Sequence, residues 1–106
     1  MSKQPAVLSP STLAHLLRPF CEKHRIQRLE VFGSVARGQH APGSDTDLLV
    51  TLDEAVPTGT LLEMAGEVEE LLGTPVDFVL RPSLEASPNR FAREHILASA
   101  VCIYEG

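Results

Sequence analysis

Two carboxylates and a Gly-Ser turn are the residues of this chain best suited to chemistry. Asp45 and Asp47 occupy alternate positions before the apolar run 48–50, and ten residues separate them from Gly33-Ser34. Alternate side chains of a strand point to one face, with Cα atoms about 6–7 Å apart. Such carboxylates can converge on metal ions held roughly 3.5–4 Å apart for displacement at phosphorus. Because a Gly-Ser turn can hold phosphate oxygens through its amides and hydroxyl, the pattern predicts chemistry on a phosphate group.

Each part of this pattern also has an ordinary structural explanation. An Asp-x-Asp pair seen alone is usually a solvated strand end, and Gly-Ser is among the commonest turn dipeptides. The apolar run after Asp47 weakens the first explanation, because it places both acids at the mouth of a buried strand. Two carboxylates on one face also repel each other unless a cation or proton intervenes. Mg²⁺ is the ordinary cation where phosphates complete the coordination.

Three further residues are candidates for the same site. Asp77 interrupts the apolar strand predicted over 76–80. If this strand is buried, Asp77 needs a metal or hydrogen bonds as partners. If it is an edge strand, Asp77 is an ordinary surface residue. Beside the other two acids, we favour the metal. Arg37 follows Ser34 by one helical turn and is either a phosphate contact or solvent-exposed. Ser44 is equally suited to capping its turn and to contacting a ligand.

Helices and strands alternate around these residues. Strands are predicted over 26–32, 45–52, 76–80 and 101–104, and helices over 10–20, 34–38, 61–72 and 88–97. This order predicts an α+β, two-layer fold: a mixed β-sheet with helices packed mainly on one face.

Local signals predict where these helices begin and end. Ser9, Thr60 and Ser87 are the predicted N-caps, and Thr60 begins a capping-box pattern. Gly73 is predicted to end the third helix, and Pro19 to kink or end the first. The apolar side of the third helix is predicted to consist of Leu61, Ala65, Val68, Leu71 and Leu72.

Length and composition limit the class of protein. The 106 residues suit one domain over 1–106, and 43% hydrophobic residues are enough for a core. Nine Lys and Arg against fourteen Asp and Glu give 9 − 14 = −5, which argues against a nucleic-acid partner. No apolar run reaches membrane-spanning length, and residues 1–5 carry no signal-peptide pattern, so we expect a cytoplasmic protein without a membrane partner.

The cysteines and histidines lack the spacing of metal ligands. Cys21 and Cys102 are expected to be buried, small apolar residues rather than a disulfide or zinc ligands. His40 lies in the loop of the motif, but a surface position is the better hypothesis. The same holds for the remaining histidines, His15, His24 and His95.

The segments 32–38 and 44–50 together closely resemble the signature of the nucleotidyltransferase superfamily that includes DNA polymerase beta. Within it, the chain resembles the minimal nucleotidyltransferases, the MNT or MntA-type antitoxins. Their pattern is Gly-Ser, ten residues, then Asp-x-Asp, with a third acid on a later strand. The resemblance covers nearly the whole chain, and the matching residues are Gly33, Ser34, Asp45, Asp47 and, in the third position, Asp77.

The resemblance implies a role for each residue. Asp45 and Asp47 would hold two Mg²⁺ ions that bridge the triphosphate of ATP. Asp77 would complete the metal site nearer the acceptor and favour deprotonation of its hydroxyl. The nucleotide would be held by Gly33, Ser34, Arg37 and Ser44.

The resemblance also implies a protein acceptor. Members of HEPN–MNT pairs, type VII toxin–antitoxin systems, transfer AMP from ATP to a tyrosine of the HEPN toxin. The small size and acidic charge agree with an acceptor supplied by a partner, and a homo-oligomer stays possible. Self-modification of Tyr104, the only tyrosine, has little to support it.

Two other functions stay open. A non-catalytic module would neutralise a toxin by covering it, although retention of all three acids argues against that role. An adenylyltransferase for a small molecule, such as an aminoglycoside, is less favoured because an acceptor-binding domain is missing.

Overall fold

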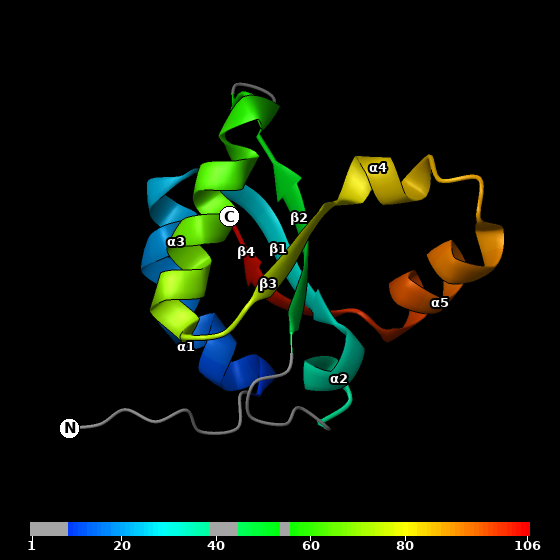
Figure 1. Cartoon of the computed structure of the whole chain (residues 1–106), viewed down its shortest axis with the longest axis horizontal. Coiled ribbons are helices and arrows are strands. Elements are labelled where there is room, and N and C mark those ends of the chain that lie inside the picture. The colour runs from blue at the N-terminus through cyan, green and yellow to red at the C-terminus, as the bar shows by residue number, and fades with distance from the viewer. Residues whose placement is uncertain (1–8, 39–44, 54–55) are drawn as a thin grey trace.

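A four-stranded mixed sheet forms the centre of the protein (Figure 1). The structure is a computed structural model and describes residues 9–38, 45–53 and 56–106. Its strands are β1 (Ile26–Phe32), β2 (Thr46–Leu52), β3 (Val76–Leu80) and β4 (Val101–Glu105). They lie in the order β3-β2-β1-β4, with β1 antiparallel to both β2 and β4, and β2 parallel to β3.

Helices cover both faces of this sheet unequally. The two longest, α1 and α3, lie on one face, and the shorter α4 and α5 lie toward the other side (Figure 1). The helices are α1 (Pro10–Lys23), α2 (Gly33–Ala36), α3 (Leu61–Leu72), α4 (Arg81–Glu85) and α5 (Arg90–Ser99), with the 3₁₀ turn η1 at Thr58–Thr60. The predicted α+β fold, with helices mainly on one face, is confirmed.

Side-chain alternation along the strands gives the sheet two different cores. Leu48 and Val50 of β2 belong to the larger core under α1 and α3, whereas Leu49 points to the other face. There it joins the smaller cluster of Phe32 and Leu84, against which Ile96 of α5 packs. The other buried members of the larger core are Leu13, Leu17, Phe20, Cys21, Ile26, Leu29, Val31, Val35, Met64, Val68 and Leu72. β2 is therefore buried on both faces, as its apolar run predicted.

The predicted strands agree closely with the observed ones. The strands at 26–32 and 76–80 are confirmed to the residue, β2 begins one residue late and β4 ends one residue late. The short helix predicted over 34–38 is α2. Ser9 caps α1 by accepting a hydrogen bond from the Thr12 amide at 3.2 Å, and Gly73 ends α3 with φ +70°.

The structure corrects the predicted capping of two helices and adds one short helix. Asn89 caps α5, because its Oδ1 accepts the Ala92 amide, whereas Ser87 Oγ accepts the amide of Asn89 itself. Thr60 is the N-cap residue of α3, as predicted, but its side chain accepts no capping hydrogen bond; its hydroxyl donates to the Pro57 carbonyl instead. The short helix α4 was not predicted, because five residues are too few for a periodic pattern.

The structure also corrects expectations about the first helix, the third helix and one cysteine. Pro19 lies inside α1, which continues to Lys23, so of the two predicted effects of Pro19, ending the helix is excluded. On α3, Met64 is buried and Leu71 is 49% exposed, because the helix turns Leu71 away from the sheet. Cys21 is buried as expected, and burial raises the pKa of its thiol to about 12. Cys102 is exposed, since β4 is an edge strand; both thiols are free. In the described part of the chain, no helix is long and apolar enough to cross a membrane.

A partly buried ion pair attaches α4 to the sheet. Glu30 of β1 is only 4% exposed, and its Oε1 accepts a hydrogen bond from Arg81 Nη1, at the start of α4, at 2.5 Å. Arg28 Nε lies 3.5 Å from the same oxygen, without hydrogen-bond geometry. Arg81 also donates to Glu85 of α4 at 3.0 Å, so the Arg81 guanidinium links the sheet to α4.

We expect Arg81→Met to lower the free energy of unfolding by about 1–3 kcal/mol, because it leaves the buried Glu30 carboxylate without its strongest partner. Urea unfolding at pH 7 measures this change. Arg90→Met is the matched control: its ion pair with Glu94 is exposed, so its loss should cost about 0–0.5 kcal/mol. Equal losses in the two variants would contradict the role of the buried pair.

Candidate active site

Three strand ends bring the predicted acids to one edge of the sheet. β2 pairs Asp47 with Phe32 of β1 on one side and with Asp77 of β3 on the other. Phe32 is the last residue of β1, so Gly33 and α2 follow directly beside Asp47. The amide of Thr46 donates to the Pro75 carbonyl at 2.9 Å and joins the starts of the two parallel strands. The chain folds two of the three acids into adjacent register positions.

Asp47 and Asp77 lie on the face of the sheet that carries the smaller core. Asp47 alternates with Leu49, and Asp77 with Val79, and both apolar residues belong to that core or pack against it. Asp45 lies directly before the first residue of β2. Asp47 is partly buried, whereas Asp45 and Asp77 are exposed. β3 is an edge strand and Asp77 is exposed on it, as expected if Asp77 were an ordinary surface residue. The pairing of β3 with β2 nevertheless places Asp77 beside Asp47.

Gly33 has a structural role that the motif did not reveal. Its φ of +75° lies in the left-handed region that favours glycine. In addition, a Cβ at this position would collide with Asp47 Oδ2 and lie 3.2 Å from Asp47 Cγ. Glycine is therefore needed because the backbone of the turn runs directly against the Asp47 carboxylate.

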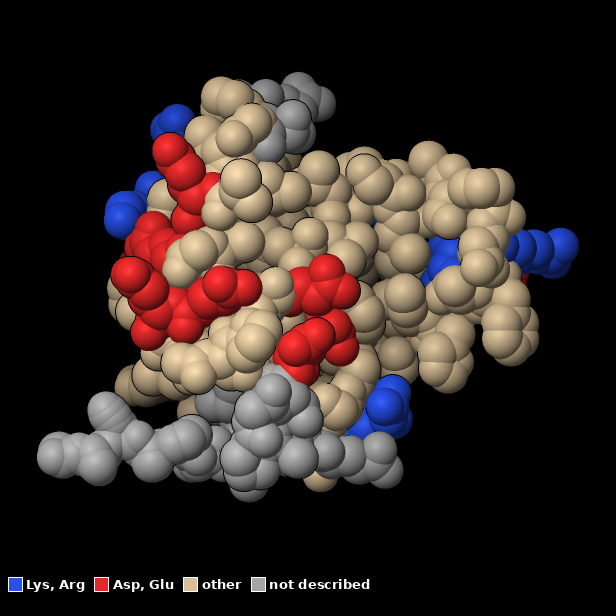
Figure 2. Space-filling view, in the orientation of Figure 1, with Lys and Arg blue, Asp and Glu red and all other residues tan. Residues whose placement is uncertain are grey.

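The electrostatics of Asp47 link the candidate residues. Its carboxyl pKa is raised above the ordinary value, first by burial and then by the negative charges of Asp77 and Asp45, while Arg37 lowers it. A bound cation can stabilise such neighbouring negative charges. Figure 2 shows acidic side chains over α3 and a second group near the start of β2.

This donor set fits Mg²⁺, which prefers carboxylate oxygens and usually completes its shell with phosphates and water. Within the described residues, no three carboxylate, histidine or cysteine groups already form a cluster able to hold an ion. The three acids are therefore neighbours rather than a closed cage, and added ligands such as phosphate oxygens would be required.

Two of the remaining predicted residues, Ser34 and Arg37, lie in or just after α2, beside this edge of the sheet. Ser34 is partly buried in α2, and Arg37 is exposed just after it, with its amide donating to the Gly33 carbonyl at 3.2 Å. Ser44 and His40 lie outside the described residues. The Glu30–Arg81 pair on the same face was not predicted; a lone acid in the apolar strand 26–32 was the available signal.

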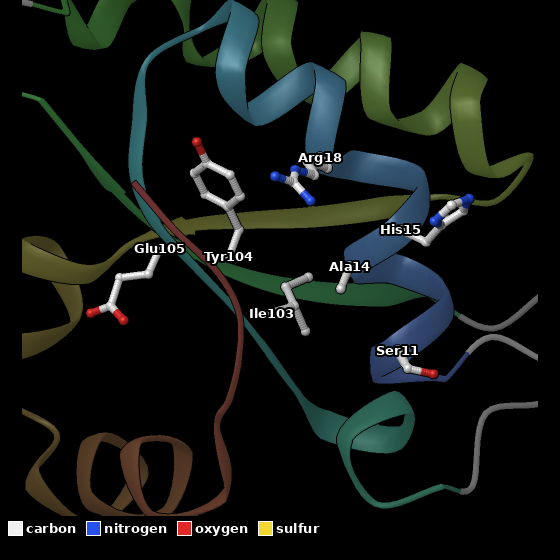
Figure 3. Close-up of a pocket in the computed structure, with 7 residues that line it drawn as sticks. All are labelled: Ser11, Ala14, His15, Arg18, Ile103, Tyr104 and Glu105. Carbon is white, nitrogen blue, oxygen red and sulfur yellow. The ribbon is translucent and has the colours of Figure 1, made fainter.

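Tyr104 does not point to the acids. It pairs with Leu29, whose side chain belongs to the larger core, and packs against that core itself. With Ile103 it lines an open pocket of about 450 Å³ against His15 and Arg18 of α1 (Figure 3). This pocket adjoins the α1 face of the sheet, so the structure gives no support to self-modification.

Comparison with known proteins identifies the family. The nucleotidyltransferase domain matches residues 13–99. The chain belongs to this family. The provisionally named protein adenylyltransferase MJ0435 of Methanocaldococcus jannaschii is 34% identical over 83 residues, 78% of this chain and 85% of that protein. Protein adenylyltransferase MntA of Thermococcus cleftensis is 35% identical over 65 residues, 61% of this chain and 66% of that protein.

Solved structures share the fold of this nucleotidyltransferase. A chain provisionally described as a minimal nucleotidyltransferase aligns with TM-score 0.69 and 33% identity, over 89% of this chain and 95% of that one. A toxin–antitoxin complex with AMP-PNP has TM-score 0.69 at 17% identity, covering 88% and 73%. A tri-AMPylated Shewanella oneidensis HEPN toxin with MNT antitoxin has TM-score 0.56 at 18%, covering 92% and 70%. The last two are likenesses of fold alone.

A pair of glycine variants separates backbone strain from the collision with Asp47. Gly38 has nearly the same φ, +72°, but nothing lies within 4 Å of a Cβ built there. We expect Gly33→Ala and Gly38→Ala each to lose about 1–2 kcal/mol of unfolding free energy from the left-handed backbone. Only Gly33→Ala should also weaken Mg²⁺–ATP binding, by roughly 10–100-fold, because it displaces Asp47. Urea unfolding and titration calorimetry measure the two effects; equal nucleotide affinities would contradict the structural role.

The raised pKa of Asp47 predicts a pH-dependent cost to stability. The folded state binds the Asp47 proton more tightly than the unfolded state does. Ionisation of Asp47 therefore lowers the free energy of unfolding as pH rises from the ordinary pKa of 3.8 to the raised pKa of the folded state, and the full loss is present above the raised pKa. Asp47→Asn should therefore be more stable than wild type at pH 7, without added metal, and lose this advantage below about pH 4. Urea unfolding across this range tests the sign; a destabilised variant at pH 7 would refute it.

Proposed function

We propose that this nucleotidyltransferase transfers AMP from ATP to a tyrosine of a HEPN-type toxin, in the presence of Mg²⁺. It would act in the cytoplasm as the antitoxin of a type VII toxin–antitoxin pair, with residues 1–106 working as one domain. The observation that carries the proposal is the register of Asp47 opposite Asp77, with Gly33 packed against Asp47. The names of the relatives support protein as the acceptor, and the likeness to toxin–antitoxin complexes supports the partner.

Two of the acids would act on the nucleotide and the third on the acceptor. Asp45 and Asp47 would hold Mg²⁺ at the triphosphate, and Asp77 would serve the acceptor side. When bound, Mg²⁺ neutralises charge on the phosphates and on the leaving pyrophosphate. Asp77 suits the acceptor side because it is exposed on the edge strand β3, where a second protein can approach.

The Gly33-Ser34 turn would hold the β- and γ-phosphates. The hydroxyl of Ser34 and the backbone amides of the turn are hydrogen-bond donors, and Arg37 adds a positive charge beside them. Arg37 already acts on Asp47 electrostatically, so the same cation can serve both acid and phosphate. Ser44 is a further proposed nucleotide contact.

The reaction is a displacement at the α-phosphorus. The tyrosine oxygen of the acceptor attacks this phosphorus as the hydroxyl proton passes toward the Asp77 side of the site. The bond from the α-phosphorus to the oxygen bridging to the β-phosphate breaks, and pyrophosphate leaves. Most of the catalysis would come from positioning and from fixed charges.

A small-molecule acceptor is the second candidate, favoured only by the open access to Asp77. A purely non-catalytic toxin-covering module is less favoured, because retaining three mutually repelling acids has a cost without a reaction to serve. The two alternatives differ from the proposal in where the nucleotide is found after incubation.

The direct test is transfer of labelled AMP. We expect the intact chain, with Mg²⁺ and α-labelled ATP, to label a tyrosine of the HEPN protein encoded beside it. Asp45→Asn and Asp47→Asn should each lower the rate by roughly 100-fold or more, because each removes a charge aimed at the reacting phosphates. Mass spectrometry locates the label and scintillation counting gives the rate.

The control is Asp53→Asn, which removes one exposed acid beyond the far end of β2. It should transfer at the wild-type rate. Partner binding without label in wild type would favour the non-catalytic module, and label found solely on a small molecule would favour the second enzyme.

A further inference from the structure

Strand β3 carries Asp77 to the candidate site although none of its five residues is fully buried. By contrast, β2 has four fully buried residues. β3 is an edge strand of the described sheet, with β2 as its neighbour. A strand that is paired on one side and buries no side chain completely frays at its end more readily than a buried strand does. The position of Asp77, the second residue of β3, therefore depends on the contacts that hold the start of this strand.

Two hydrogen bonds hold the start of β3, one on each side of the strand. On the inner side, the Thr46 amide donates to the Pro75 carbonyl at 2.9 Å. Because successive peptide groups of a strand point in opposite directions, the Val76 amide points away from β2. Glu69 of α3 reaches this outward amide, and its Oε2 accepts the Val76 N–H at 3.1 Å. Glu69 therefore holds the residue directly before Asp77.

Helix α3 gives this contact a firm base. Val68 and Leu72, on either side of Glu69 in the sequence, are buried in the larger core. The Gly73 amide donates to the Glu69 carbonyl at 2.8 Å, and a short connection then leads into β3 (Figure 1). α3 packs on the face of the sheet opposite to the one that carries Asp77. The Glu69 side chain thus connects the larger core, across the edge of the sheet, with the strand end that bears the acid.

The other glutamates of α3 do not hold β3 in this way. Glu67 accepts hydrogen bonds from Lys23 and His24 of α1, at 3.1 Å and 2.9 Å. Glu70, next to Glu69, is exposed, and among the described residues no hydrogen bond or ion pair involves it. The contact with the Val76 amide is therefore particular to Glu69 and does not follow from the general acidity of the helix.

We infer that Glu69 is a positioning residue for the reaction: by holding the Val76 amide, it keeps Asp77 opposite Asp47. In this assignment Glu69 touches neither nucleotide nor acceptor and acts through the backbone of β3. The inference rests on the proposed function, in which Asp77 serves the acceptor side. Loss of Glu69 should therefore slow the transfer of AMP and leave unchanged the binding of Mg²⁺–ATP, which is assigned to Asp45 and Asp47.

The first test measures AMP transfer to the HEPN protein encoded beside the chain. Glu69→Ala should lower kcat roughly tenfold, the lower end of the loss caused by removing a residue that supports a ligating group, because this hydrogen bond is exposed to solvent. Its Mg²⁺–ATP affinity, measured by titration calorimetry, should match that of wild type. Glu69→Gln keeps an acceptor oxygen and should recover most of the rate, which a role for the charge alone does not predict.

Two further variants show whether the effect passes through Asp77. Glu70→Ala is the matched control, because it removes the neighbouring exposed carboxylate of the same helix; it should transfer AMP at the wild-type rate. Adding Glu69→Ala to Asp77→Asn should lower the single-turnover rate no further, because the two residues then act as one unit. Urea unfolding checks that every variant is folded under the assay conditions.

The second test follows the strand itself, by hydrogen exchange of individual amides measured with NMR. Glu69→Ala should speed exchange of the Val76 and Asp77 amides by at least about threefold, because the start of β3 opens more often. The Leu49 amide of β2 should keep its wild-type rate in the same variant. In Glu70→Ala, all three amides should exchange as they do in wild type.

The outcomes separate this inference from the proposed function. Unchanged exchange of the Asp77 amide in Glu69→Ala would overturn the positioning role whatever the acceptor. Faster exchange with an unchanged kcat would leave Glu69 as a contact of the fold and would also overturn it, as would equal losses of rate in Glu69→Ala and Glu69→Gln. Faster exchange, with no labelling of the partner even by wild type, would refute the proposed acceptor and support Glu69 as the residue that holds Asp77.

Discussion

Asp47 and Asp77 face each other across the parallel pair of β2 and β3, and the chain must hold these like charges together for its site to exist. Burial is the first cause of the raised pKa of Asp47, and repulsion from Asp77 is the second. What opposes this repulsion is the burial of β2 between two cores, with Leu48 and Val50 on one face and Leu49 on the other. A strand anchored on both faces cannot slip by one residue without moving every apolar side chain to the wrong face, so the register of the acids is protected.

The position of α4 and α5 depends on a second buried interaction. Glu30 lies on the acid-bearing face of β1 and holds Arg81, the first residue of α4. The chain then continues through Ser87, whose carbonyl accepts a hydrogen bond from Arg93 at 2.9 Å, into α5. Through α4, α5 is thus connected by polar contacts to the sheet that carries the acids. A small apolar cluster completes this connection.

The acids and helix α5 lie in differently constrained parts of this small domain. The acids and the Gly-Ser turn lie at strand ends, where the backbone is held by the sheet. α5 lies outside this framework and buries no residue completely, so its outer side can vary without disturbing the core. Substitutions on the outer side of α5 can therefore leave the register of Asp47 and Asp77 unchanged.

Local patterns in the sequence determined most of the fold and the identity of the candidate residues. The strands at 26–32 and 76–80, the buried strand after Asp47 and the helix end at Gly73 were predicted without a structure. Each depends only on residues that are neighbours in the chain. Those same patterns did not reveal α4, which is too short to be periodic. They also failed for Cys102, because only the strand order puts β4 at an edge.

The tertiary structure decided everything that depends on residues distant in sequence. It paired Asp47 with Asp77, and it showed that Gly33 leaves space for a carboxylate fourteen positions later. It also turned Tyr104 toward the larger core and brought α5 to the face of the acids. The sequence alone determined which groups the chain has for chemistry, and the packing of the sheet determined which of them meet, because register and facing arise only when strands pair and bury their apolar sides.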